Sequence, residues 1–132
     1  MKSRDHIIRL KRFQVEERRR RVQQIEAMIA DFHRMATDLD REIASEESRS
    51  GISDPSHFAY PTYARAAAVR RDNLKHSAEE LKGQMADARS NLDVALDDFR
   101  KAESLEGREK AADRNSAEQR AQPEFPLGLA GA

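Results

Sequence analysis

The chain has no cysteine and no tryptophan, and five Phe and two Tyr are its only aromatic residues. Without cysteine there is no disulfide framework, no thiolate metal site and no cysteine nucleophile. Apolar residues make up 38% of the 132 positions and charged residues 36%. This composition is too poor in hydrophobic side chains for a thick globular core, but it suffices for a narrow contact between two helices.

The sequence also lacks an excess of charge of either sign and any long apolar run. Lys and Arg number 24, as do Asp and Glu, so the chain as a whole has no field that would concentrate nucleic acid or anionic lipid. No apolar run approaches the roughly 18 residues that span a bilayer. No apolar segment follows Met1–His6, as it would in a signal peptide. We therefore expect a cytoplasmic protein.

What the chain does contain is a heptad repeat in two segments, with apolar residues at spacings of three and four, or of seven where the intermediate position is not apolar. The members in the first segment are Ile8, Val15, Val22, Ile25, Ile29, Phe32, Ala36, Leu39 and Ile43. Those in the second are Ala64, Ala67, Leu74, Ala78, Leu81, Met85, Ala88, Leu92, Ala95, Phe99 and Ala102. This spacing is typical of the seam of a coiled coil, the apolar stripe along which two helices pack.

Proline and glycine mark the boundaries of these segments. The sequence predicts a helix over about 3–50, a loop over 51–61 and a second helix over about 62–106, where Gly107 weakens the pattern. We expect residues 1–106 to form an all-α, antiparallel two-helix coiled-coil hairpin. Residues 107–132 are expected to be a polar tail, partly helical and then disordered.

In an antiparallel hairpin, residues whose numbers add up to about 110 should face each other. The expected layers are Ile25 with Met85, Ile29 with Leu81, Phe32 with Ala78, Ala36 with Leu74, and Ile43 with Ala67. Large residues face small ones, which keeps the seam at constant width. A shift by one heptad also aligns the two patterns, so the register stays open to that extent, as does the choice between monomer and dimer.

Toward the termini, Lys11 and Arg18 fall on the seam, opposite Phe99 and Leu92. Their aliphatic stems can pack there, and a cation can lie over the ring.

The strongest charge asymmetry lies in residues 1–21, which hold nine basic residues against three acidic ones, including Arg18, Arg19, Arg20 and Arg21 in succession. These arginines form either a solvated helix face or a docking patch for an acidic protein partner. Nucleic acid is the weakest interpretation, because no aromatic stacking platform or reading motif accompanies them. We expect no nucleic-acid partner.

The expected loop and the start of the second helix carry Phe58, Tyr60 and Tyr63. They either close the end of the seam or form an exposed aromatic patch that anchors a partner.

No residue pattern predicts chemistry. The four histidines (His6, His33, His57 and His76) lack metal-ligand spacing, paired acids fall on helix exteriors, and there is no phosphate-binding glycine loop. We expect no catalytic, cofactor or metal site.

Three stretches, residues 9–21, 24–32 and 51–61, resemble the FliJ family, coiled-coil proteins of the bacterial flagellar export apparatus, and its alphaproteobacterial members in particular. The likeness covers about residues 1–105 and is most specific in the loop. It implies a cytoplasmic hairpin at the flagellar base, similar to the central stalk of rotary ATPases. It also implies three partners: the export ATPase, the cytoplasmic domain of the export gate, and export chaperones.

The expected function is thus non-enzymatic: to couple the export ATPase ring to the gate and to aid delivery of substrates. The alternative is a structural or adaptor coiled coil that self-associates. In the first case, we expect the arginines to engage the ATPase at the open end of the hairpin, and the aromatic residues to engage the gate.

Overall fold

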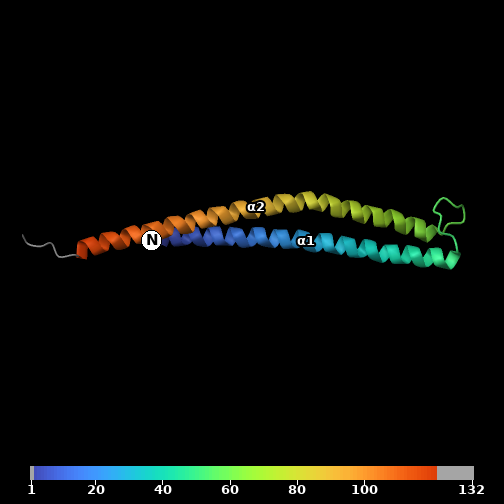
Figure 1. Ribbon diagram of the computed structural model, residues 1–132, viewed down its shortest axis with the longest axis horizontal. Helices are drawn as coiled ribbons and strands as arrows, with labels where there is room; N and C mark the ends of the chain where they lie inside the picture. The colour runs from blue at the N-terminus through green and yellow to red at the C-terminus, as the bar shows by residue number, and fades with distance from the viewer. Residues whose placement is uncertain (1, 122–132) are drawn as a thin grey trace, which may run out of the picture. The chain divides into compact units, whose positions relative to one another are not determined.

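The computed structural model describes residues 2–121, and side chains from Arg4 to Arg120. It contains two helices, α1 (Lys2–Ser50) and α2 (Thr62–Ala121), joined by a loop (Figure 1). The helices contact each other as an antiparallel hairpin, which confirms the predicted all-α, two-helix coiled coil. The expected disordered tail lies outside the described residues, beyond Ala121.

Helix α1 ends where the sequence predicts, at Ser50, directly before Gly51. No Pro or Gly interrupts residues 2–50, and Asp5 and Arg49 lie in the turns where the helix dipole favours their charges. Gly51 has a φ of 73°, and its amide donates to the carbonyl of Glu47 over 2.9 Å. A residue with a side chain is strained in this left-handed conformation, so glycine is the natural stop.

The loop over 51–61 contains a turn built on Asp54. Its Oδ1 accepts from the amide of Ser56 at 3.0 Å and from the Ser56 hydroxyl at 2.7 Å, and these bonds lower the pKa of Asp54. Two backbone bonds continue the chain reversal, from His57 to Asp54 and from Tyr60 to His57, both 3.0 Å. The loop is therefore held by its own hydrogen bonds.

Helix α2 continues beyond the predicted end near residue 106, through Gly107 to Ala121. A single glycine in a helix interior costs only about 1 kcal/mol relative to alanine. Good helix formers surround it, and Lys110 pairs with Glu106 at 2.8 Å one turn apart. Side chains 111–120 are all exposed, so the seam ends before the helix does, as the loss of the apolar pattern predicts.

The hairpin divides into two compact units. Over the described residues, one consists of residues 2–15 with 95–121, and there Ile8, Val15 and Ala95 are buried. An ion pair joins Arg4 and Glu109. The cation over Phe99 comes from Arg12, whose guanidinium lies 5.5 Å from the ring centroid, and not from Lys11 as predicted. Lys11 itself is half-buried on the seam, and the exposed Arg12 next to it supplies the cation that lies over Phe99.

The other unit, residues 16–94, holds most of the core in two clusters. The first consists of Val22, Ile25, Leu81, Met85 and Ala88, with Ile29, Phe32 and Leu92 packed against it. The second consists of Ile43, Tyr60, Ala64 and Ala67, with Leu39 and Ala68 packed against it. All the apolar residues predicted for the seam are buried or half-buried. Arg18 is the exception among the predicted seam residues, because it is exposed.

Contacts between the helices of this second unit follow the predicted register. Arg71 bonds Asp40 at 3.0 Å, and Tyr63 bonds Glu42 at 2.7 Å. The numbers of the Arg71–Asp40 pair add up to 111, and Ile43 and Ala67, which share the second core cluster, add up to the expected 110; the longer side chains of Tyr63 and Glu42 meet at 105.

Candidate interaction surfaces

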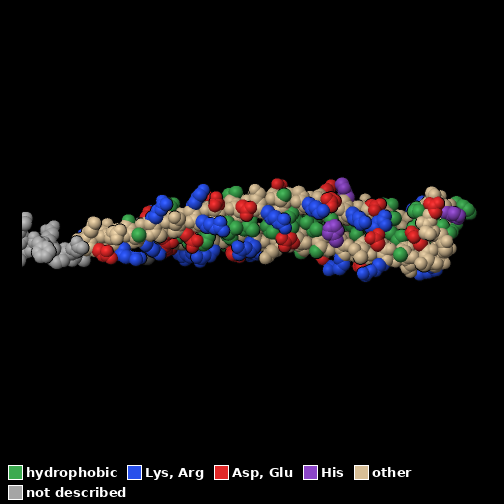
Figure 2. All heavy atoms as spheres, viewed as in Figure 1, with side chains coloured by type: hydrophobic (Ala, Val, Ile, Leu, Met, Phe, Trp, Pro, Cys, Tyr) green, Lys and Arg blue, Asp and Glu red, His purple; other side chains and the backbone are tan. Residues whose placement is uncertain are grey.

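The outer surface of the helices is charged. Figure 2 shows basic and acidic side chains interleaved along them, with hydrophobic side chains visible between. Over the described residues, no helix is long and apolar enough to cross a membrane. Within that same range no group of three or more His, Asp or Glu side chains could hold a metal ion.

The arginine cluster, Arg18–Arg21, lies in the first half of α1, the half that was predicted to form the open end of the hairpin. Helix α1 begins at Lys2, so about 25 Å of helix precedes the cluster. All four side chains are exposed, and a helix that turns about 100° per residue spreads them around its circumference. Arg19 pairs with the Glu16 carboxylate at 3.2 Å, and Arg20 donates to the Glu16 carbonyl over 3.4 Å.

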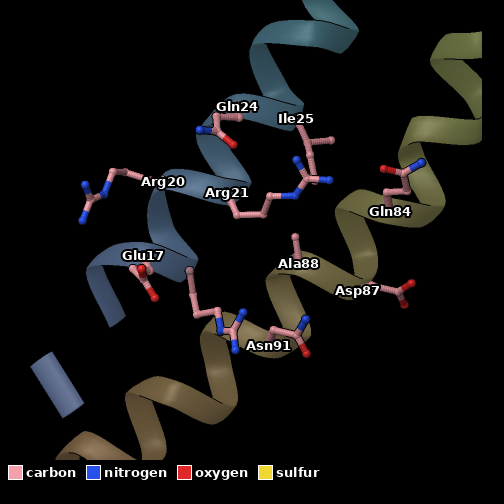
Figure 3. Close-up of a pocket in the computed structure, with 10 residues that line it drawn as sticks. Glu17, Arg20, Arg21, Gln24, Ile25, Gln84, Asp87, Ala88 and Asn91 are labelled. Atoms are coloured by element: carbon pink, nitrogen blue, oxygen red, sulfur yellow. The ribbon is translucent and has the colours of Figure 1, made fainter. Parts of the chain in front are cut away.

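Part of this cluster lines a hollow between the two helices, which we call the polar groove (Figure 3). Its volume is about 610 Å³. Helix α1 contributes Glu17, Arg18, Arg20, Arg21, Gln24 and Ile25, and α2 contributes Gln84, Asp87, Ala88 and Asn91. In Figure 3, Arg21 extends across toward α2 near Ala88, whereas Arg20 points away. Sequence reasoning missed the α2 wall, although the pairing rule places residues 84–91 opposite this turn of α1.

The three aromatic residues near the loop have different environments. Phe58 is 95% exposed, and its ring stacks on His57 with centroids 4.8 Å apart. Tyr60 is only 6% exposed and belongs to the second core cluster. Tyr60 therefore closes the end of the seam, whereas Phe58 presents an exposed ring, and its anchoring of a partner stays a prediction.

The tyrosine hydroxyls are tied to acidic residues of α1. Tyr60 donates to Glu47 at 2.8 Å, and Tyr63, which is 54% exposed, donates to Glu42 at 2.7 Å. Because each bond needs the hydroxyl proton, it raises the pKa of its tyrosine. These bonds fix the end of the loop and the first turn of α2 against the C-terminal part of α1.

Arg71 occupies a seam position that the apolar pattern leaves out, seven residues after Ala64 and seven before Ala78. Its guanidinium bonds Asp40 across the helices at 3.0 Å and Asp72 at 3.1 Å. The hydrogen bond to Asp40 raises the pKa of Arg71. A single polar layer of this kind specifies register in coiled coils.

Further apolar side chains remain uncovered. Ile7, Leu10 and Phe13 are 47%, 48% and 53% exposed. Because they recur every third residue, they share one side of the first turns of α1. A second hollow, of about 660 Å³, has Ile29 and Met85 among its lining residues.

No family model matches the chain, and no curated protein or solved structure is similar enough to count as a match. The class of protein therefore rests on its own geometry. That class is an antiparallel two-helix coiled coil whose surfaces offer an arginine-lined groove and an exposed aromatic ring.

Proposed function

We propose that this protein is a non-enzymatic component of the bacterial flagellar export apparatus. It would couple the export ATPase ring to the cytoplasmic domain of the export gate and assist export chaperones, in the cytoplasm at the flagellar base. The likeness of residues 9–21, 24–32 and 51–61 to the FliJ family supports this. The structural observation that carries the proposal is the pairing of α1 and α2 within one chain. A continuous coiled coil is stiff along its axis and suits the transmission of force between two partners.

Two surfaces of the unit formed by residues 16–94 suit two different partners. Between Arg21 and Ser50, α1 runs for roughly 45 Å, which separates the arginine cluster from the loop. The cluster offers guanidinium groups for carboxylates on the ATPase, and Phe58 offers an apolar anchor for the gate. The separation lets both bind at once.

Replacing Arg19, Arg20 and Arg21 with Glu should weaken binding of the purified export ATPase, most strongly at low salt, because exposed charges are screened as salt rises. Binding of the gate domain should be unchanged. Phe58→Ala should have the opposite effect on the two partners. Biolayer interferometry with each purified partner measures both, and circular dichroism checks that helicity is intact. Phe58 is the correct residue to change, because replacing Tyr60 also removes part of the core.

If both variants bind both partners as tightly as the wild type does, the two-surface assignment is wrong. If only the ATPase and gate assignments are exchanged, the coupling function stands with its polarity reversed.

Self-association is the second candidate function, and the exposed Ile7, Leu10 and Phe13 favour it. Covering such a stripe with a second copy would bury apolar surface at about 25 cal/mol per Å². If the chain self-associates, the melting temperature rises with protein concentration, and analytical ultracentrifugation finds a dimer that Leu10→Glu dissolves. A concentration-independent melting temperature and a monomeric mass rule this function out.

A further inference from the structure

We propose that the polar groove binds an acidic peptide segment of a partner protein. Its lining combines cationic side chains of α1 with amide side chains of α2, so it is a composite site that neither helix presents alone (Figure 3). This inference deepens the proposed function, because it assigns a chemistry to the partner at the arginine cluster. Its test does not require the export ATPase.

Two guanidinium groups of the groove are available to a ligand. Within the described side chains, Arg18 and Arg21 make no ion pair and no hydrogen bond, in contrast to Arg19 and Arg20, which contact Glu16. Arg18 and Arg21 are three residues apart and therefore neighbours on one face of α1. Each guanidinium can hold a carboxylate through two parallel hydrogen bonds. The pair is thus suited to two carboxylates about one helical turn apart.

The opposite wall is suited to a peptide backbone. Gln84 and Asn91 are seven residues apart, which places them on one face of α2, two turns from each other. Their amides can both donate to peptide carbonyls and accept from peptide N–H groups. Ala88, between them, is 5% exposed and short, so it leaves room above the seam beside Ile25. A ligand lying there meets carboxylate receptors on one side and amide groups on the other.

The same lining disfavours nucleic acid. None of the lining residues is aromatic, so bases lack the aromatic stacking platform typical of single-strand binding sites. Glu17 and Asp87 also line the rim of the groove, and in Figure 3 the Asp87 carboxylate points away from Ala88. A continuous phosphate backbone crossing that rim meets two like charges, whereas a peptide can place its carboxylates only where the arginines are.

The test measures binding of a fluorescein-labelled decaglutamate peptide to the full chain by fluorescence anisotropy at low ionic strength. The variant Arg18→Gln/Arg21→Gln should bind about tenfold more weakly than the wild type, because it loses both carboxylate receptors. The matched control, Arg34→Gln/Arg41→Gln, removes the same charge from exposed positions of α1 that pair locally with Asp31 and Asp38. It should bind the peptide as the wild type does. Arg18→Lys/Arg21→Lys, which keeps the charge but not the bidentate geometry, should lie between.

Several outcomes would overturn the proposal. The wild type could fail to bind decaglutamate, or both glutamine variants could lose affinity equally, which would show only an effect of net charge. Tighter binding of a ten-nucleotide oligothymidine would assign the groove to nucleic acid instead. A dimer that Arg18→Gln/Arg21→Gln dissolves would assign it to a second copy of the chain. If the groove variant loses the peptide yet still binds the export ATPase, the groove is correct and its partner lies elsewhere.

Discussion

Ile25→Ala should lower the free energy of unfolding by about 3 kcal/mol, within the range of about 2–5 kcal/mol for removing a large buried aliphatic side chain. Ile25 is 1% exposed and sits in the core cluster with Leu81, Met85 and Ala88. Its truncation loses buried methyl groups and leaves a cavity, because helices held by their other layers cannot fully collapse onto it. Urea unfolding followed by circular dichroism at the helical band measures the change.

Met28→Ala is the matched control for Ile25→Ala. Met28 lies less than one turn further along α1 but is 42% exposed, and alanine is at least as good a helix former. We expect a change within about 0.5 kcal/mol, typical of surface positions. Equal losses for both variants would contradict the seam described for α1.

The hairpin was predictable because burial between two helices depends on little except sequence spacing. In a two-helix contact, a residue is covered only if it recurs at intervals of three and four, and Ile25 and Ala88 satisfy this by position alone. The end of α1 before Gly51 was predictable as well, since the left-handed φ of Gly51 is the conformation that favours glycine. The end of α1 and the apolar seam residues therefore followed from local rules.

The end of α2 was not predictable on the same grounds. Gly107 imposes a small local cost, and whether the helix continues depends on the sum of weak propensities and i,i+4 pairs around it. The contact over Phe99 has a similar origin. Lys11 and Arg12 are both long enough to reach the ring, so the heptad position of one residue does not decide which cation lies there.

The candidate site was only half predictable. The run of four arginines can be read from the sequence, but the different contacts of its members cannot. Arg19 and Arg20 contact Glu16, whereas Arg21 extends toward α2. Predicting the α2 wall of the polar groove requires knowing which residues of the two helices face each other, and the heptad pattern left that register open by one repeat. At the loop, composition alone could not separate the buried Tyr60 from the exposed Phe58, because their difference depends on the path of the turn, which places Tyr60 in the second core cluster with its hydroxyl bonded to Glu47.

The register itself predicts a reciprocal exchange. Residues whose numbers add up to about 110 face each other, as Arg71 and Asp40 do, and this pairing places Ala78 opposite Phe32. The ring of Phe32 is half-buried and packs against the first core cluster. Phe32→Ala alone should destabilise by about 2–3 kcal/mol, below the usual range for a fully buried aromatic residue. Ala78 is 0% exposed, so Ala78→Phe alone should cost about 1–3 kcal/mol through overpacking.

The double variant Phe32→Ala/Ala78→Phe should be more stable than the sum of the two single changes by at least about 1 kcal/mol, because the ring returns to the same layer from the other helix. Urea unfolding of the four proteins gives this coupling energy. A register displaced by one heptad would put Phe32 opposite Arg71 or Met85 instead of Ala78. The phenylalanine introduced at position 78 would then overpack a layer from which no side chain had been removed. The destabilisation of the double variant would equal the sum of the two single effects. Additive costs would therefore contradict the register, and with it the α2 wall of the polar groove, since Gln84 and Asn91 face Arg18 and Arg21 only in this pairing.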